Sequence, residues 1–517
     1  MPIKSELADV NVPLVPFHEM IFSELQQYGS QVALINNDTN ETFTFEDILL
    51  KTKFIANSLV AMGIEKGEPI ILCVPNCPEY VWLFLGISLA GGIVCPLHPN
   101  FSQDEMRWQI MDSASRFAFV VPHALDNVSA IFNELSINYR IVCIGNRQLS
   151  KGFPVLADLA LTAARCSSAY PEMTPEEDIV FLPYSTGTSG PRKGVAISHF
   201  VLNAMLKTFN NKDAYELPNH GEFILSSALF HDTFGRDMLF SSLLNGATVV
   251  TFTDDVKTLF VSTTTLRHLC NAKIIDRYPY YHLKTVVIGT EAVGEDTIKR
   301  AYRCLPSVKH FSAVYEMTEV GIICRTTKLT PFKSRSCGTL CAGLSMMVID
   351  LVSGAELGIN EQGLILLRGQ TVVSPYWNND KATFEDFKRN GWRNTGDIGF
   401  YDKDGNVFLV DREKQMIKVD GFQVTPQELE SILLTHPSIA EAAIVPATKV
   451  DHQEIPIAFV VLKPRASATA EQIKEFINER VMRHKQVDDV VIAMTLPRSP
   501  GGKILWRLLR EAANRYA

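Results

Sequence analysis

The 517-residue sequence lacks any stretch of eighteen or more consecutive apolar residues, so no transmembrane helix is expected. Its first twenty residues lack the basic and then apolar segments of a signal peptide, and the final NRYA is not an SKL-type address. The ten cysteines show no metal-binding or disulfide spacing, because even the closest pair, Cys73 and Cys77, is not CxxC. These absences predict a cytoplasmic protein whose cysteines are structural thiols.

The chain also lacks an excess of basic over acidic residues. Charged residues make up 21% of the chain and the formal net charge is -8, which gives no electrostatic reason to expect a nucleic-acid partner. The length, together with a hydrophobic content of 46%, exceeds what one hydrophobic core normally supports. We therefore expect at least two globular units.

Strand-like and helix-like segments alternate from residue 44 onward, which predicts an α/β fold with mainly parallel sheets covered by helices. Thr44 and Asp47 predict the start of a helix that ends at Gly63, and Ser102 with Glu105 predicts another helix start. A further helix is expected at 76–92. Strands are expected at 70–74, 93–97, 117–121, 179–183, 195–199, 247–252 and 285–290.

The pattern changes near residue 400. The segment FYDKDGNVFLVDR (400–412) alternates like a β-hairpin with a DG turn. Beyond it, Thr425 and Glu428 predict a capping box around a helix with Pro426 in its first turn, and strands are expected at 455–463 and 490–496. We place the boundary at about residue 411, which predicts a large N-terminal domain (1–411) and a small α+β C-terminal domain (412–517) on a hinge.

The most informative segment is LPYSTGTSGPRKGVAISH (182–199), which leaves a buried strand and returns to another. Its glycines let backbone amides approach a polyanion, its hydroxyl side chains add donors, and Lys193 supplies a positive charge. Arg192 precedes the lysine and no Ser or Thr follows it, so the segment is not a Walker A loop. The residues predict a phosphate-binding loop, and an ordinary flexible Gly/Ser/Thr loop is the alternative.

Four other segments follow this loop in order: VYEMTEVG (314–321), NTGDIGFYDKDG (394–405), DREKQMIKVDGFQVTPQELE (411–430) and PRSPGGKIL (497–505). Together the five segments resemble the successive core motifs of the adenylate-forming superfamily, and most closely its 4-coumarate-CoA ligase-like branch. The resemblance runs from about residue 20 to the end. It implies an acid-thiol ligase that uses ATP, Mg²⁺ and coenzyme A to convert a carboxylic acid into an acyl-AMP and then an acyl-CoA thioester.

The resemblance implies roles for individual residues in the adenylation step. Thr318 is expected beside the α-phosphate, Glu319 at the magnesium ion, and Asp397 at both ribose hydroxyls. Arg412 resembles a second ribose or phosphate contact. Lys503 is expected to bridge the attacking carboxylate and the α-phosphate, where its charge would offset both anions in the transition state. The expected clamp on the triphosphate consists of Ser185, Thr186, Gly187, Thr188, Ser189 and Lys193.

Other residues resemble those of the acyl and coenzyme A sites. His231 matches a gate between the acyl pocket and the coenzyme A tunnel, and a core histidine is the alternative. Lys414 occupies the hinge position and Lys418 matches a lysine that contacts the adenylate. Asp420 and Gly421 match the loop that lines the coenzyme A channel. The remaining residues expected around the acyl-adenylate are Thr233, Glu291 and Val314.

The sequence departs from the family pattern at several positions. Glu316 replaces a glycine beside the acyl pocket, Leu364 replaces a usual glutamate, and Asp420 replaces a common lysine. The region 246–269 is shorter by about one crossover helix, through a deletion or an incomplete gene sequence, so strands 249–252 and 259–262 are not expected to lie parallel in adjacent positions. Two alternatives follow: adenylation with transfer to a carrier protein or oxidation, and a non-catalytic nucleotide-binding or acyl-binding relative. The residues do not identify the acid.

Overall fold

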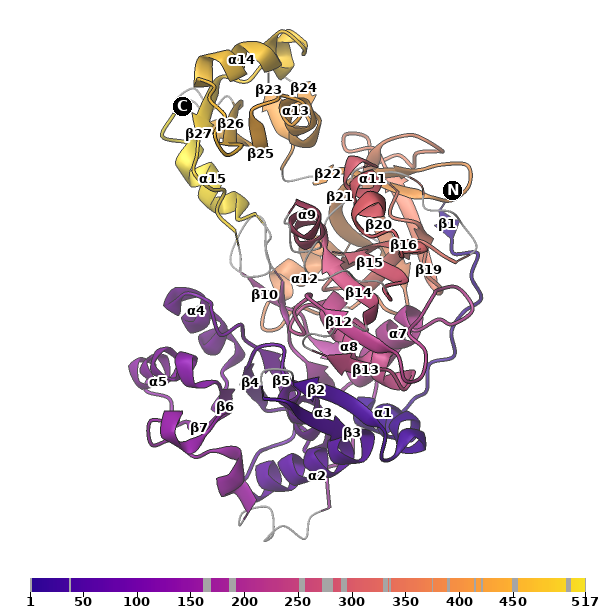
Figure 1. The fold of residues 1–517 in the computed structure, drawn as a ribbon, viewed down its shortest axis with the longest axis vertical. Coiled ribbons are helices and arrows are strands. Elements are labelled where there is room, and N and C mark those ends of the chain that lie inside the picture. Colours follow the sequence, from indigo (N-terminus) through magenta and orange to yellow (C-terminus); the bar gives the residue numbers. More distant parts are fainter. Residues whose placement is uncertain are drawn as a thin grey trace.

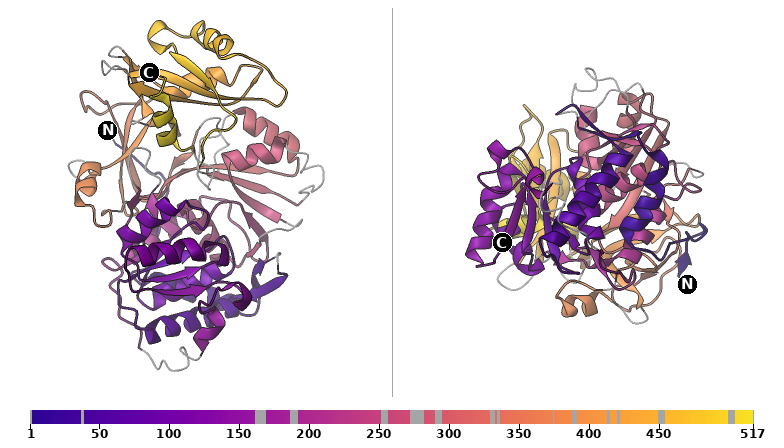
Figure 2. Two further views of the ribbon diagram at one scale, coloured as in Figure 1. Left: turned by 90° about the vertical axis from the view of Figure 1, so that its left-hand side faces the viewer. Right: turned by 90° about the horizontal axis from the view of Figure 1, so that it is seen from below.

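The structure is a computed structural model in which the C-terminal segments form a lobe at one end of the longest axis (Figure 1). After a quarter turn about that axis, this lobe again lies at one end of the molecule (Figure 2). The residues that the structure describes are 2–36, 39–160, 169–185, 192–250, 256–271, 282–289, 295–328, 333, 336–373, 375–387, 391–412, 415–419, 422–448, 454–498 and 504–516.

The N-terminal part contains a mainly parallel sheet with the strand order β11-β8-β5-β4-β6-β7. Each neighbouring pair is parallel except β11 with β8. The strands expected at 70–74, 93–97, 117–121 and 179–183 are confirmed, whereas the segment 195–199 contributes only two residues. The strands are β4 (Pro69–Cys73), β5 (Ile93–Pro96), β6 (Phe117–Val120), β7 (Arg140–Cys143), β8 (Ile179–Phe181) and β11 (Ile197–Ser198).

Helices of this part begin where the sequence predicts. Thr44 Oγ1 accepts a hydrogen bond from the Asp47 amide at 3.0 Å, and Asp47 accepts one from the Thr44 amide at 2.8 Å. Ser102 and Glu105 form the same capping box. Two N-terminal amide groups of each helix thereby gain acceptors that the helix itself cannot supply. The helices are α2 (Phe45–Ala61), α3 (Glu79–Leu89), α4 (Gln103–Ser113) and α5 (Leu125–Glu134).

A second sheet has the strand order β18-β17-β16-β15-β14-β12-β13-β2-β3. Its strands from β16 to β2 are parallel, and antiparallel strands lie at both edges. The strands are β2 (Val32–Asn36), β3 (Glu41–Thr44), β12 (Phe223–Ser226), β13 (Thr248–Val250), β14 (Val256–Ser262), β15 (Thr285–Gly289), β16 (His310–Met317), β17 (Gly321–Arg325) and β18 (Thr339–Leu340). The helices of this part are α1 (Phe17–Leu25), α7 (His199–Phe209), α8 (Thr233–Leu244), α9 (Thr263–Asn271) and α11 (Glu295–Cys304).

The shortened region 246–269 contains strands β13 and β14 of this sheet. Strand β12 lies between β13 and β14 and pairs in parallel with both. Phe223 is level with Thr248 on one side and with Val256 on the other, so the two flanking strands begin at the same height. Strands β13 and β14 are therefore parallel but not adjacent, so the expectation that they do not lie parallel in adjacent positions is confirmed. The link 251–255 lies outside the described residues.

An antiparallel sheet, which the sequence patterns do not predict as a separate layer, completes the N-terminal part. Its order is β1-β19-β20-β21-β22, and the hairpin expected at 400–412 forms its β21–β22 edge with Gly405 at φ +74°. Leu364, which replaces a usual glutamate, is buried in β20 with 4% of its surface exposed. The strands are β1 (Ile3–Lys4), β19 (Leu344–Ile349), β20 (Gly363–Gly369), β21 (Arg393–Tyr401) and β22 (Val407–Arg412).

The C-terminal lobe contains the sheet β25-β26-β27, the hairpin β23–β24 and helices that cover them. The expected strands at 455–463 and 490–496 are confirmed, but the expected capping box is wrong. Thr425 makes no side-chain cap, and Glu428 instead accepts from Lys485 Nζ at 2.7 Å. The elements are β23 (Ile417–Val419), β24 (Phe422–Val424), β25 (Ile439–Thr448), β26 (Glu454–Leu462), β27 (Asp489–Ile492), α13 (Pro426–Leu433), α14 (Ala470–Asn478) and α15 (Trp506–Ala513).

The architecture confirms the expected α/β fold class with a large N-terminal part and a smaller C-terminal one. One continuous apolar core joins the two mainly parallel sheets, whereas the C-terminal lobe has apolar clusters of its own. Within the described ranges, no helix combines the length and the hydropathy needed to cross a membrane.

Candidate active site

The two ends of the expected phosphate loop meet in a short hairpin. Strands β9 (Tyr184–Ser185) and β10 (Lys193–Gly194) pair antiparallel, and Ser185 lies directly opposite Lys193. The chain therefore leaves the hairpin at Ser185 and re-enters it beside this residue, at Lys193. Its residues Thr186, Gly187, Thr188 and Ser189 lie outside the described residues.

Helix α4 holds both ends of this loop. Before the loop, the Tyr184 hydroxyl donates to Asp112 Oδ2 at 2.7 Å. After it, Trp108 Nε1 donates to the Arg192 carbonyl at 3.1 Å, and Arg192 Nη2 lies 2.9 Å from Glu105 Oε1. Three side chains of one helix thus fix where the loop begins and ends. The sequence assigns Glu105 only to the helix cap, and the structure gives it this second contact.

Glu319 occupies the turn between β16 and β17, yet only 7% of its surface is exposed. A carboxylate in a tight turn normally faces water, so its burial needs a compensating partner. The Tyr376 hydroxyl lies 2.8 Å from Glu319 Oε1, and the Val373 amide donates to the Glu319 carbonyl at 2.9 Å. Val373 and Tyr376 therefore fix the backbone and the side chain of Glu319.

The segment 373–377 joins Glu319 to the phosphate loop. The Trp377 amide donates to the Gly194 carbonyl at 2.8 Å, and Lys193 Nζ lies 4.5 Å from the centre of the Tyr376 ring. Burial and the neighbouring Glu319 raise the pKa of Tyr376, so its hydroxyl keeps its proton at neutral pH. Ser185, Lys193 and Glu319, which lie far apart in the sequence, are thus brought to one place.

A carboxylate that the sequence does not single out completes this cluster. Asp386, the last residue of α12 (Asp380–Asp386), places Oδ2 2.7 Å from the Tyr376 hydroxyl. The same oxygen lies 3.5 Å from Lys193 Nζ and 3.7 Å from Arg393 Nη2. Tyr376 and Asp386 occur where the sequence shows no recognisable local pattern, so only the fold reveals them.

Asp397 and Arg412 face each other across the β21–β22 hairpin, where they are paired in register. Arg412 Nε lies 3.0 Å from Asp397 Oδ1, and the Tyr315 hydroxyl donates to Asp397 Oδ2 at 2.5 Å. Asp397 raises the pKa of the Arg412 guanidinium, and burial raises the pKa of Tyr315. Asp397 is 4% exposed whereas the Arg412 side chain is about half exposed, so the pair reaches from the interior to the surface. The sequence assigns no role to Tyr315, although this residue lies inside the VYEMTEVG motif.

His231 and Thr233 lie at the start of α8 against aromatic side chains. The His231 ring is centred 5.6 Å from Tyr80 and 5.7 Å from His98, and it is 8% exposed. Burial, and then the charge of His98, lower the pKa of His231 to about 3, so the imidazole is neutral. Thr233 Oγ1 has no hydrogen-bond partner among the described residues, whereas the His231 ring lies against the backbone of Leu72 and Val74. Buried polar atoms without partners are rare in proteins and suit a ligand-binding position.

The other expected site residues are placed only in part. Val314 is buried in β16, Thr318 is half-buried in the turn after that strand, and Glu316 is half-buried at a register shift between β16 and β17. Lys418 is described only through its backbone in β23. The residues that lie outside the described ranges are Glu291, Lys414, Asp420, Gly421 and Lys503.

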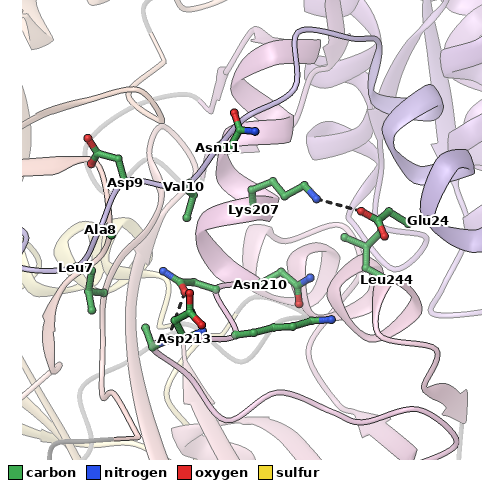
Figure 3. A pocket seen from close by; sticks show the side chains of 13 residues that line it. Leu7, Ala8, Asp9, Val10, Asn11, Glu24, Lys207, Asn210, Asp213 and Leu244 are labelled. Atoms are coloured by element: carbon green, nitrogen blue, oxygen red, sulfur yellow. Dashed lines mark hydrogen bonds and ion pairs between the residues drawn. The ribbon is translucent and has the colours of Figure 1, made fainter.

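A pocket of about 420 Å³ lies elsewhere, between the N-terminal segment and the C-terminal end of α7 (Figure 3). Lys207 and Glu24 form an ion pair in its wall, with Nζ and Oε1 3.3 Å apart. Its lining contains none of the expected site residues, so we do not assign it to the reaction.

Two family models match the chain. The model of the AMP-binding enzyme matches residues 21–377, and the model of the AMP-binding enzyme C-terminal domain matches residues 428–503. The chain belongs to the AMP-binding enzyme family. The resemblance that the five sequence motifs indicate is therefore confirmed.

Relatives of this AMP-binding enzyme match over nearly its full length. It is 33% identical to 4-coumarate-CoA ligase 2 of Petroselinum crispum, with 98% of this chain and 96% of the relative covered. It is 31% identical to 4-coumarate-CoA ligase of Vanilla planifolia, with 98% and 95% covered.

Solved structures share the fold. ATP-bound MatB from Rhodopseudomonas palustris superposes with a TM-score of 0.86 at 22% identity, over 97% of this chain and 99% of that one. The anthranilate CoA ligase AuaEII in complex with anthranoyl-AMP superposes with a TM-score of 0.85 at 23% identity, over 98% of both chains. The two-part architecture is therefore that of known AMP-binding enzymes.

Proposed function

We propose that this protein is an ATP-dependent carboxylate-CoA ligase whose preferred substrate is a planar aromatic acid. In the first step the acid and ATP give an acyl-AMP and pyrophosphate. In the second step the thiol of coenzyme A displaces AMP and forms the thioester. The observation that carries the proposal is full-length similarity to 4-coumarate-CoA ligases, combined with the convergence of Ser185, Lys193 and Glu319 at one place.

The residues of the loop and the hairpin suit ATP. Lys193 presents an ammonium group beside the ends of the phosphate loop, where it would attract the triphosphate. Each carboxylate oxygen of Asp397 can accept a second hydrogen bond beside the one from Arg412 or Tyr315, so the two oxygens suit the two ribose hydroxyls. Arg412, held by Asp397, would contact the ribose or a phosphate. Lys503 would offset the charges of the attacking carboxylate and the α-phosphate.

A magnesium ion fits the cluster at Tyr376. Two carboxylate oxygens, from Glu319 and Asp386, approach one hydroxyl, whose single proton can be donated to only one of them at a time. Asp386 already faces Lys193 and Arg393, so Glu319 is the carboxylate that suits a hard cation, whose shell phosphate oxygens and water would complete. Glu319 would hold the ion, which when bound would reduce the negative charge of the phosphates. Tyr376 would keep the Glu319 carboxylate in place.

The acyl group would lie near His231 and Thr233. The neutral imidazole of His231 adds no charge at this position, and Thr233 Oγ1 could bind a polar atom of the acid or of pantetheine. Glu291 and Val314 would form other parts of the wall, and Glu316 would narrow it. These expected wall residues, together with the 30–33% identity to 4-coumarate-CoA ligases, favour an aryl acid over a fatty acid as the substrate.

For the second step, the C-terminal domain (412–517) would turn about Lys414 and bring Asp420 and Gly421 to the coenzyme A channel. Lys418 would contact the adenylate. The boundary at residue 411 agrees with the interval between the two family matches, which end and begin at residues 377 and 428.

The test is a screen of the purified protein with ATP, Mg²⁺ and acids of different classes, including 4-coumarate, anthranilate, benzoate and fatty acids. Pyrophosphate release and mass spectrometry of acyl-AMP and acyl-CoA are measured with and without coenzyme A. We expect an aryl acid to give all three products and the Lys503→Ala variant to give far less acyl-AMP. Absence of acid-dependent pyrophosphate release from the parent protein would refute the proposal.

A second candidate is adenylation with an acceptor other than coenzyme A. Asp420 favours it, because an aspartate in place of a common lysine removes a positive charge from the expected coenzyme A side. Acid-dependent pyrophosphate exchange that proceeds without acyl-CoA formation would support this candidate over the first.

A further inference from the structure

Asp386 Oδ2 is shared by two cations and one hydroxyl. It lies 3.5 Å from Lys193 Nζ, 3.7 Å from Arg393 Nη2 and 2.7 Å from the Tyr376 hydroxyl. Helix α12, which ends at Asp386, lies beside β10, which begins at Lys193 (Figure 1). The Asp386 carboxylate therefore lies beside Lys193, the residue at which the phosphate loop ends and β10 begins.

Burial differs between the two cations. The Arg393 side chain is 1% exposed, and among the described residues its Nε and Nη2 atoms have no hydrogen-bond partner. Its charge is partly offset by Asp386 and by the faces of Tyr376 and Phe387, which lie 5.0 and 5.1 Å from its guanidinium carbon. Lys193 is 28% exposed and can leave the pair. Asp386 thus has one fixed cationic partner, Arg393, and one that can move to a bound anion, Lys193.

We propose that Asp386 is a positioning residue that competes with polyphosphate for Lys193 and so limits how tightly ATP and pyrophosphate are held. The inference rests on the proposed function, because it requires that the loop 185–193 binds the phosphates of ATP. In the free enzyme Asp386 holds the ammonium group of Lys193 over the Tyr376 ring. When phosphate binds, Lys193 turns to it, and when pyrophosphate leaves, Asp386 takes the lysine back.

The size of the effect follows from the geometry. A separation of 3.5 Å and partial exposure of both partners make this a weak ion pair, comparable to surface pairs. We therefore expect removal of the charge to tighten polyphosphate binding about three- to fivefold, not by orders of magnitude.

The experiment compares Asp386→Asn with Glu385→Gln. Asparagine keeps an oxygen that can accept from the Tyr376 hydroxyl, so the shape of the cluster is retained. Glu385 lies in the same helix, is 59% exposed and lies 4.0 Å from Lys381 Nζ, so its substitution makes the same charge change on the surface. Binding of pyrophosphate and of ATP with Mg²⁺ is measured by titration calorimetry, and the KM for ATP and for the acid by pyrophosphate release.

We expect Asp386→Asn to lower the dissociation constants of pyrophosphate and ATP about three- to fivefold, with an unchanged KM for the acid. Glu385→Gln should match the parent. In a Lys193→Gln background the Asp386→Asn change should have no effect on these constants, because Asp386 acts through the lysine. If the role of Asp386 were merely structural, Asp386→Asn would still change these dissociation constants in the Lys193→Gln background.

Unchanged or weaker polyphosphate binding in Asp386→Asn would overturn the inference, as would an equal gain in the Lys193→Gln background. Failure of the proposed function gives a different result. In that case the parent protein shows no acid-dependent pyrophosphate release with any acid, whereas the binding measurements still compare Asp386→Asn with the parent. A parent protein that binds neither pyrophosphate nor ATP would refute both.

Discussion

Tyr376→Phe removes one hydroxyl from the centre of the site and keeps the aromatic ring beside Lys193. The lost group lies 2.8 Å from Glu319 Oε1 and 2.7 Å from Asp386 Oδ2. A hydrogen bond to a charged partner contributes about 1.5–3 kcal/mol, and the single proton supplies one such bond at a time. Without it, the two carboxylates also face each other with no hydroxyl between them. We expect kcat/KM for ATP to fall about 10- to 100-fold.

The assay is acid-dependent pyrophosphate release at varied ATP, together with unfolding in denaturant, which separates an effect on the site from a loss of folded protein. Tyr215→Phe is the matched control, because it removes a buried hydroxyl that lies 3.1 Å from Cys341 Sγ, among residues with no assigned role in the reaction. We expect this control to change stability by about 1 kcal/mol or less and to leave KM for ATP unchanged. The reasoning is wrong if Tyr376→Phe lowers kcat/KM for ATP less than threefold, or if only the KM for the acid changes.

Three other variants test separate parts of the structure. Asp397→Asn should lower ATP turnover at least 10-fold in the pyrophosphate assay, since it removes the charge facing Arg412; parent-like turnover would exclude a role for that charge. Arg192→Ala should raise KM for ATP a few-fold by freeing the loop from Glu105, and an unchanged rate of proteolysis within the loop would contradict this. Burial raises the pKa of Glu430 to about 8, so the folded protein binds an extra proton and loses about 3–4 kcal/mol of stability as the pH rises from about 5 to 8. Denaturant unfolding of Glu430→Gln should not show this pH dependence.

Local signals in the sequence predicted much of the fold. The capping boxes at Thr44 and Ser102 form as expected, because each uses atoms only three residues apart. The DG hairpin also forms, because its turn needs only a short segment with Gly405 at positive φ. The box expected at Thr425 fails because Lys485, distant in the sequence, takes the Glu428 carboxylate.

Local sequence signals did not predict the position of β12 in the sheet. The spacing of residues 246–269 correctly indicated that β13 and β14 do not lie side by side, but not that another strand separates them. Strand order is decided by which apolar faces pack together across the whole chain, and a pattern of period two does not specify the neighbour.

The sequence by itself determined the family, the α/β class and the motif residues, because ordered motifs and periodic patterns are read along the chain. The tertiary structure alone decided which groups meet. It joined Lys193 to Glu319 through Tyr376, placed Asp386 beside Lys193, and buried Tyr315 against Asp397. The physical reason is that a side chain acquires its charge balance and its hydrogen-bond partners from atoms within a few ångströms, and these come from segments that only packing brings together.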